Sequence, residues 1–256
     1  MVTSANRVTY DQCDPAEWAL RVDLAAAFRL AVYFDWHESV GNHFSAAVSG
    51  DGRTFLLNPK WKHFGSVRAS DLLLLSADDE SVMEMENAPD PTAWSIHGSV
   101  HGVVSRAKVL LHCHPPYATA LCALKDPDLK PVDQNTARYF KRISIDLDFG
   151  GMADSIDEGQ RIARSLGDND VMFMGNHGVT VIGETVADAF ENLYYLERSA
   201  KTMVLAYSTG QPLNVMSDEM AENVAIQWQP FVKGLAQGHF EYLKSVLDRD
   251  DPSYRD

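Results

Sequence analysis

The 256-residue sequence has only three cysteines and no long uninterrupted hydrophobic run. A helix that crosses a membrane needs a run of about 18 apolar residues or more, so we expect no transmembrane segment. The first seven residues also lack the apolar core of a secretory signal. We therefore expect a cytoplasmic location. The cysteines are odd in number and have no zinc-ribbon spacing, which favours reduced, structural thiols. They are Cys13, Cys113 and Cys122.

Basic residues are scarce, since 22 lysines and arginines face 36 acidic residues and give a formal net charge of −14. Such a protein repels a phosphate backbone, so nucleic-acid binding is not expected. The acidic run 78–86 has no calcium-loop spacing and is interpreted as a solvated loop. The sequence also lacks an internal repeat, a low-complexity tract and a linker, which predicts one domain over residues 1–256.

Hydrophobic periodicity predicts short strands interleaved with helices, the pattern of an α/β layered fold. The first helix is expected over about 14–34, with Asp14 as N-cap and Pro15 in the first turn. Thr92 is expected to cap a second helix, and Thr185 a third that runs to about Met203. Further helices are predicted over 116–124, 135–142, 157–166 and 241–247. Strands are predicted over 44–49, 54–58, 72–76, 109–112, 171–174 and 179–182.

Three histidines stand in two distinctive contexts. His112 and His114 end an apolar run, and residues i and i+2 of a strand point to the same face. Their imidazoles can therefore converge, while Cys113 points to the other face. His177 lies in a Gly-x-x-Gly turn between two apolar runs. Three neutral imidazoles with an open coordination position are typical of a catalytic divalent metal site.

These motifs, in this order, resemble the class II aldolase/adducin family over most of the chain, roughly from Trp18 to Tyr254. The resemblance implies a three-layer α/β/α fold with a central, largely antiparallel sheet. It also implies a homotetramer and a divalent metal on the three histidines, zinc first, with iron, manganese or cobalt as alternatives. The segments that carry it are His112-Cys113-His114, Asn176-His177-Gly178, Gly41-Asn42-His43-Phe44-Ser45 and Leu57-Asn58-Pro59.

The sequence departs from the sugar-phosphate aldolases of that family at three places. Ala93 occupies the position of the glutamate that moves the proton in those enzymes. Lys60-Trp61 replaces the Thr-Gly of the phosphate loop, so the glycine that lets amides approach a phosphate is missing. Asp133 or Gln134 falls where the family has a tyrosine acid. We therefore expect a small, nonphosphorylated substrate rather than a sugar phosphate.

The remaining site candidates each have a structural alternative. Tyr117 and His43 are the two candidate proton carriers among the side chains, although Tyr117 could instead pack on the sheet. A metal-bound hydroxide is the third candidate for the base. Expected substrate contacts are Asn42, Lys60, Thr92 and Gln134, although Asn42 could instead shape a turn and Lys60 could be solvated. His97 and His101, at i and i+4 on a helix, are expected to be packed or hydrogen-bonded. Glu197 is expected in a surface ion pair with Lys201.

The sequence thus favours a metal-dependent lyase that acts on a small hydroxy- or oxo-compound through a metal-stabilised enolate. Carbon–carbon lysis, decarboxylation and epimerisation all remain open. One alternative is an Fe(II)-dependent oxygenase on the same fold, because the missing glutamate leaves coordination positions open. The other is a non-catalytic interaction module like the adducin head. None of the three needs a nucleic-acid or membrane partner.

Overall fold

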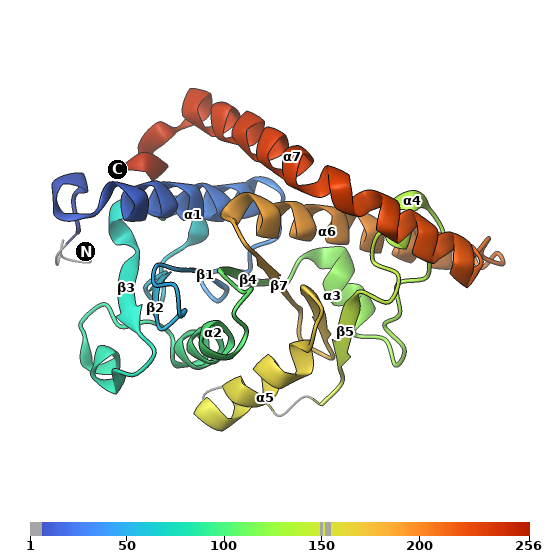
Figure 1. Cartoon of the computed structure of the whole chain (residues 1–256), viewed down its shortest axis with the longest axis horizontal. Helices are drawn as coiled ribbons and strands as arrows, with labels where there is room; N and C mark the ends of the chain where they lie inside the picture. The colour runs from blue at the N-terminus through green and yellow to red at the C-terminus, as the bar shows by residue number, and fades with distance from the viewer. Residues whose placement is uncertain (1–6, 149–150, 152–154) are drawn as a thin grey trace.

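The computed structural model describes residues 7–148, 151 and 155–256 (Figure 1). The sequence before Arg7, on which the prediction of no secretory signal depends, lies outside this part. Within the described residues, no helix is long and apolar enough to cross a membrane. The three cysteines are free thiols, as expected.

The centre of the fold is a seven-stranded sheet with the order β3-β2-β1-β4-β7-β6-β5. Neighbouring strands are antiparallel except for β5 and β6, which are parallel. The prediction of a central, largely antiparallel sheet is therefore confirmed. The strands are β1 (His43–Ala47), β2 (Thr54–Leu57), β3 (Leu73–Ser76), β4 (Val109–Cys113), β5 (Ile143–Asp146), β6 (Val171–Met174) and β7 (Val179–Gly183).

Helices cover both faces of the sheet, as Figure 1 shows. One layer consists of α1 (Pro15–Tyr33), α6 (Val186–Ser208) and α7 (Asp218–Asp250), and the other of α2 (Pro91–Val103) and α5 (Ile156–Leu166). The predicted three-layer arrangement is confirmed. The shorter helices are α3 (Pro116–Cys122), α4 (Gln134–Ala137), η1 (Tyr10–Gln12), η2 (Phe64–Ser66), η3 (Ala69–Asp71), η4 (Glu80–Glu84) and η5 (Pro252–Arg255).

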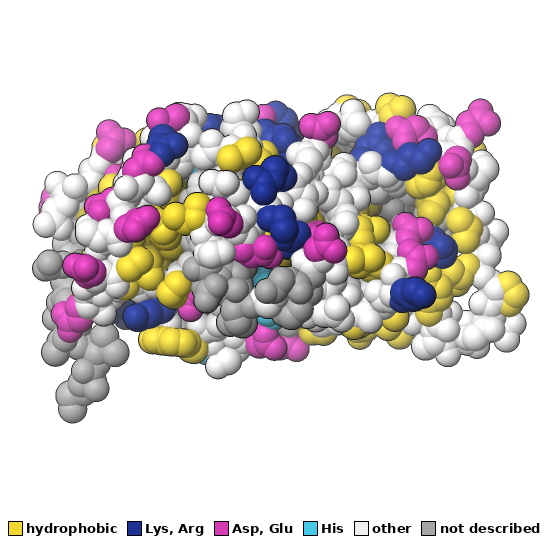
Figure 2. Space-filling model, turned by 90° about the horizontal axis from the view of Figure 1, so that it is seen from below, with side chains coloured by type: hydrophobic (Ala, Val, Ile, Leu, Met, Phe, Trp, Pro, Cys, Tyr) yellow, Lys and Arg dark blue, Asp and Glu magenta, His cyan; other side chains and the backbone are white. Residues whose placement is uncertain are grey.

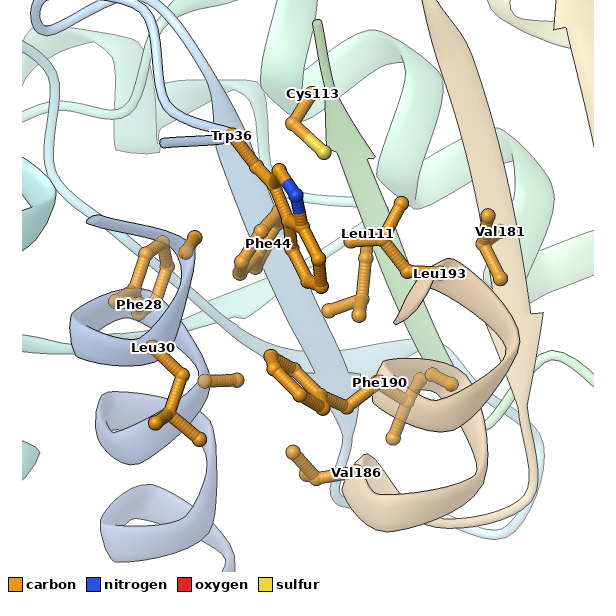
Figure 3. Packing of buried hydrophobic residues seen from close by; sticks show 14 of the residues in the cluster. Phe28, Leu30, Trp36, Phe44, Leu111, Cys113, Val181, Val186, Phe190 and Leu193 are labelled. Atoms are coloured by element: carbon orange, nitrogen blue, oxygen red, sulfur yellow. The ribbon is translucent and has the colours of Figure 1, made fainter. Parts of the chain in front are cut away.

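The pleat of β4 divides its residues between two apolar cores. Leu111 and Cys113 belong to the larger core, which lies between the sheet, α1 and α6 (Figure 3). Leu110 belongs to the smaller core against α2 and α5. His112 alternates with Leu111 and Cys113, so it lies on the α2 side of the sheet. His112 is thereby kept away from the main hydrophobic core.

Three helix predictions are wrong in detail. Asp90, rather than Thr92, caps α2, because its carboxylate accepts the Thr92 N–H at 2.9 Å. The helix expected over 135–142 ends at Ala137, and Lys141 has a φ of 55°, which a helix does not tolerate. The helix expected over 241–247 is the end of the 33-residue α7.

Candidate metal centre

The three histidines converge beside the end of β4. Strands β4 and β7 pair with His112 opposite Thr180, which brings the turn before Val179 next to His114. One nitrogen from each of His112, His114 and His177 lies within 4.8 Å of the other two. The structure thus brings together the three residues that were predicted as metal ligands. In Figure 2, histidine side chains reach the surface near acidic side chains.

A tight turn presents His177. Its N–H donates to the Met174 carbonyl at 3.1 Å, and Asn176 adopts a left-handed φ of 56°. Asparagine tolerates that conformation better than most residues. The Asn176 N–H also donates to the Cys122 carbonyl at 3.0 Å, which ties the turn to the end of α3. These backbone hydrogen bonds therefore fix the position from which the His177 side chain projects.

The Nδ1 atoms of His112 and His114 already have partners. Nδ1 of His114 contacts the Glu38 carboxylate, and Nδ1 of His112 lies 3.3 Å from the Thr180 hydroxyl. An imidazole held at Nδ1 binds a metal through Nε2, and a carboxylate behind it raises its basicity. Nε2 of His114 is buried and has no hydrogen-bond partner among the described residues. These donors fit a divalent cation.

Burial keeps the imidazoles of His112 and His177 in the neutral form that metals bind. It lowers the pKa of His177 to about 4 and that of His112 well below its usual value. Metal ligation requires deprotonated imidazole, so these two side chains are ready for a cation near neutral pH. Sequence reasoning missed Glu38, because a loop carboxylate 76 positions from His114 follows no local pattern.

His43 lies directly beside the three histidines. It faces His112 across β1 and β4, and the two rings stack with centroids 4.7 Å apart. Its Nδ1 lies 2.7 Å from Nε2 of His97 on α2. His97 and His101 are buried and hydrogen-bonded, as expected. The structure therefore places one of the two candidate proton carriers at the centre.

Tyr117 and Glu197 are part of the junction between α3 and α6. The N–H groups of Tyr117 and Ala118 donate to the Glu197 carboxylate at 2.9 and 2.8 Å, and Lys201 lies over the Tyr117 ring. Glu197 is only 6% exposed, so the prediction of a surface ion pair is wrong. Burial raises its pKa to about 7. The carboxylate caps α3, the short helix that follows β4.

The four expected substrate contacts occupy different surroundings. Asn42 is buried beside His43, and its Oδ1 has no partner among the described residues. Thr92 donates its hydroxyl to Asp90 at 2.5 Å, and the Lys60 N–H donates to the Ala88 carbonyl at 3.3 Å. The Gln134 carbonyl accepts the indole N–H of Trp228. Among the described residues, Asn42 is the one of these four that has an unpartnered buried acceptor next to the histidines.

Trp228 lines a separate cavity of about 470 Å³ that also includes Arg138 and Arg142. None of the three converging histidines lines it. Within the part of the chain that the structure describes, the three histidines form a convergent set of metal donors, and the residues that line this cavity do not. Gln134 belongs to the surroundings of this cavity through its contact with Trp228.

The position of the missing glutamate is apolar. Ala93 is 1% exposed and packs in a cluster with Phe55, Leu57 and Trp94. No proton carrier can stand there without displacing this packing. The side chains near the three imidazoles that can carry a proton must therefore come from other elements, and His43 is one of them.

Residues 22–204 match the family model described as Class II Aldolase and Adducin N-terminal domain. The chain belongs to the class II aldolase/adducin family. A Caulobacter vibrioides relative that carries an aldolase class 2 name is 29% identical over 94% of this chain and 93% of its own. Human beta-adducin is 25% identical over 91% of this chain, which spans only 34% of that protein.

A solved structure in the same family matches nearly the whole chain. It is an aldolase II superfamily protein from Pseudomonas syringae, with a TM-score of 0.87 and 30% identity. The match covers 96% of this chain and 98% of that one. The family predicted from the histidine motifs is thus confirmed.

Proposed function

We propose that this protein is a metal-dependent lyase of the class II aldolase type that acts on a small, nonphosphorylated hydroxy- or oxo-compound. The observation that carries the proposal is Nε2 of His114, buried and unpartnered among the described residues, with the Glu38 carboxylate behind its ring. An orphaned nitrogen of this kind is costly unless a ligand binds it. The neighbouring imidazoles make that ligand a divalent cation, zinc first.

His112, His114 and His177 would hold the metal, which supplies Lewis-acid stabilisation of an enolate when bound. The chain itself supplies the remaining groups. Asn42 offers an amide oxygen for orienting the substrate, and His43 and Tyr117 are the candidates for holding a proton. Of these two, His43 is favoured because its ring stacks on His112, whereas the Tyr117 ring lies under Lys201 of α6.

Two alternatives to the lyase are kept, the non-catalytic interaction module and the Fe(II)-dependent oxygenase. Decarboxylase NovR of Streptomyces niveus is 26% identical over 64% of this chain, which favours a lyase. The adducin relatives favour an interaction module. The Fe(II) oxygenase would use the same three histidines but would require iron and would consume dioxygen. We further propose a homotetramer, which light scattering of the purified protein would test.

Metal analysis is the deciding experiment. The purified protein is expected to hold about one divalent ion per chain, and the His114→Ala variant to lose it. His239→Gln is the matched control, because His239 pairs with Glu191 on α6 and takes no part in the centre. Failure of the wild type to retain or take up stoichiometric metal would leave the interaction module as the better interpretation.

A substrate panel then separates the enzymatic alternatives. Metal-loaded protein is incubated with small hydroxy- and oxo-acids while carbon–carbon cleavage, carbon dioxide release and oxygen uptake are followed. The lyase predicts product without oxygen uptake, and the loss of product in His114→Ala. Oxygen consumption that depends on Fe(II) and on the acid would overturn the lyase in favour of the oxygenase.

A further inference from the structure

A buried chain of side chains leads from the metal centre across the α2 side of the sheet. Nδ1 of His43 lies 2.7 Å from Nε2 of His97, and Nδ1 of His97 contacts the Ser45 hydroxyl. The same hydroxyl lies 2.7 Å from Nε2 of His101, whose Nδ1 lies 2.6 Å from the Ala107 carbonyl oxygen. All four side chains are at most 4% exposed. They join β1 to α2.

The hydrogen bond between His101 and the Ala107 carbonyl determines which atom donates in each of the other hydrogen bonds. A carbonyl oxygen can only accept, so Nδ1 of His101 donates to Ala107 and carries the proton. A neutral imidazole has a single N–H, which makes Nε2 of His101 an acceptor for the Ser45 hydroxyl. The Ser45 oxygen then accepts from Nδ1 of His97. Nε2 of His97 is left as an acceptor, and Nδ1 of His43 must donate to it.

Burial keeps the rings of His97 and His101 neutral, so each of them carries a single N–H. It lowers the pKa of His101 to about 4 and that of His97 well below its usual value. The neighbouring Lys108 further lowers the pKa of His101, although the hydrogen bond to Ala107 opposes this. No acidic side chain is among the groups that shift the pKa of His97 or His101. The hydrogen bonds from His43 to Ala107 therefore allow one consistent placement of protons on the imidazole nitrogens.

We propose that this series of hydrogen bonds, from His43 through His97, Ser45 and His101 to Ala107, fixes the tautomer of His43 with the proton on Nδ1. Its Nε2 then accepts a hydrogen bond from a hydroxyl group of the substrate. The substrate class is therefore a hydroxy-acid or another compound with a hydroxyl beside its metal-binding group. Ser45, His97 and His101 are positioning residues. The choice of substrate rests on the proposed function, whereas the fixed tautomer does not.

The position of His43 supports this role. Its ring is stacked on that of His112 at an interplanar angle of 23°, one strand away from the candidate ligands. Burial lowers the pKa of His43 to about 3, the Asp90 carboxylate opposes this shift, and His177 and His114 add to it. Because Nδ1 of His43 donates to His97 on α2, Nε2 is the ring nitrogen of His43 that remains for a ligand. Any hydroxyl that approaches it meets an acceptor, and a substrate carbonyl or carboxylate there would be repelled.

Nitrogen-15 NMR of the whole protein tests the tautomers without metal or substrate. Long-range proton–nitrogen spectra distinguish protonated from bare imidazole nitrogens, and His→Asn variants at positions 43, 97 and 101 assign the signals. His43, His97 and His101 are all expected in the Nδ1–H tautomer, opposite to the one that free neutral histidine prefers. A protonated Nε2 on His43 or His97 overturns the inference while leaving the metal results intact.

The Ser45→Ala variant removes the hydroxyl that links His97 to His101. His101 serves as an internal control within the same protein. His101 is expected to keep its Nδ1 proton, because the Ala107 carbonyl still binds it, while His97 and His43 are expected to populate both tautomers. Ser45→Thr retains the hydroxyl and is expected to restore the wild-type pattern. An unchanged His43 signal in Ser45→Ala would show that the chain does not set its tautomer. The wild-type spectrum decides if these variants do not fold.

Glycolate and acetate, which differ by one hydroxyl, test the substrate class on zinc-loaded protein. Titration followed through the His43 nitrogen signals gives both affinities. The ratio of glycolate to acetate affinity is expected to fall roughly twofold in Ser45→Ala, because about half of the His43 rings would then lack the accepting Nε2, and to recover in Ser45→Thr. An equal ratio in all three proteins, or no response of Nε2 to glycolate, overturns the hydroxyl assignment. If the protein takes up no zinc, the proposed function fails while the tautomer result stands.

Discussion

A side chain at position 178 would collide with a candidate metal ligand: a Cβ added to Gly178 would lie 2.3 Å from Cδ2 of His114. It would also lie 2.8 Å from the Cys113 carbonyl oxygen. The glycine after His177 is thus needed for space rather than for an unusual backbone angle. It lets the turn of one ligand lie against the ring of another.

Gly178→Ala is expected to rotate the His114 ring and lower metal affinity by about tenfold or more, with a stability loss of about 1–3 kcal/mol. Zinc titration and urea unfolding measure the two effects. Gly234→Ala is the control, because nothing lies within 4 Å of its added Cβ on α7. It is expected to leave metal binding unchanged and to stabilise the helix by up to about 1 kcal/mol. Equal affinity in both variants would contradict the packing argument.

Glu38 is expected to strengthen the metal site through His114. Replacing it by glutamine keeps an acceptor near Nδ1 but removes the charge that makes the imidazole a better ligand. Metal affinity should fall about 10- to 100-fold, as competition with a chelator would measure. Glu184→Gln removes an exposed carboxylate paired with Lys233 and should have no such effect. A Glu38→Gln protein with wild-type affinity would show that the contact is incidental.

The buried carboxyl group of Glu197 should make stability depend on pH. Its pKa is raised from 4.5 to about 7, chiefly by burial, so the folded state holds the proton more tightly than the unfolded state. Stability relative to Glu197→Gln is therefore highest below pH 4.5 and falls as the pH rises through 7. Urea unfolding of both proteins between pH 5 and 8 measures the difference.

The control for this experiment is Glu222→Gln. Arg142 lowers the pKa of Glu222, so that carboxylate contributes stability above its unfolded pKa and shows no loss toward neutral pH. A Glu197 variant whose stability runs parallel to wild type from pH 5 to 8 would mean that the Glu197 carboxyl group does not titrate in this window.

Restoring a glutamate at position 93 should damage the protein rather than convert it. The side chain would place a carboxylate in the apolar cluster of Phe55, Leu57 and Trp94. We expect Ala93→Glu to lose at least about 2 kcal/mol of unfolding free energy and to gain no sugar-phosphate cleavage. Ala120→Glu, at an exposed position of α3, is the control and should be nearly neutral. Gain of cleavage by a stable Ala93→Glu protein would refute this reasoning.

The sequence predicts correctly those features that depend on a single helix or strand. Asp14 and Pro15 mark the start of α1, and the alternation of β4 correctly brings His112 and His114 together. Helix α7 was largely missed because few of its 33 residues are buried and Pro230 interrupts the pattern. Its long exposed surface carries little amphipathic signal.

Contacts between distant segments were beyond the reach of the sequence. Glu38 and His114 meet across 76 positions, and Glu197 reaches the N–H groups of α3 across about 80. The chain from His43 to His101 likewise needs β1 and α2 side by side. No periodicity or motif spacing encodes such meetings, because packing of the whole fold creates them.

The single residue between His112 and His114 bears on which metals the protein can select. The thiol of Cys113 lies in the main core near Trp36 and Phe44, and burial raises its pKa well above the usual value (Figure 3). Soft ions such as Cu(I) prefer thiolate, and here they would meet only nitrogen donors. At the proposed metal centre, the pleat of this one strand would thus disfavour soft metals, and it would also separate an oxidisable sulfur from a redox-active ion.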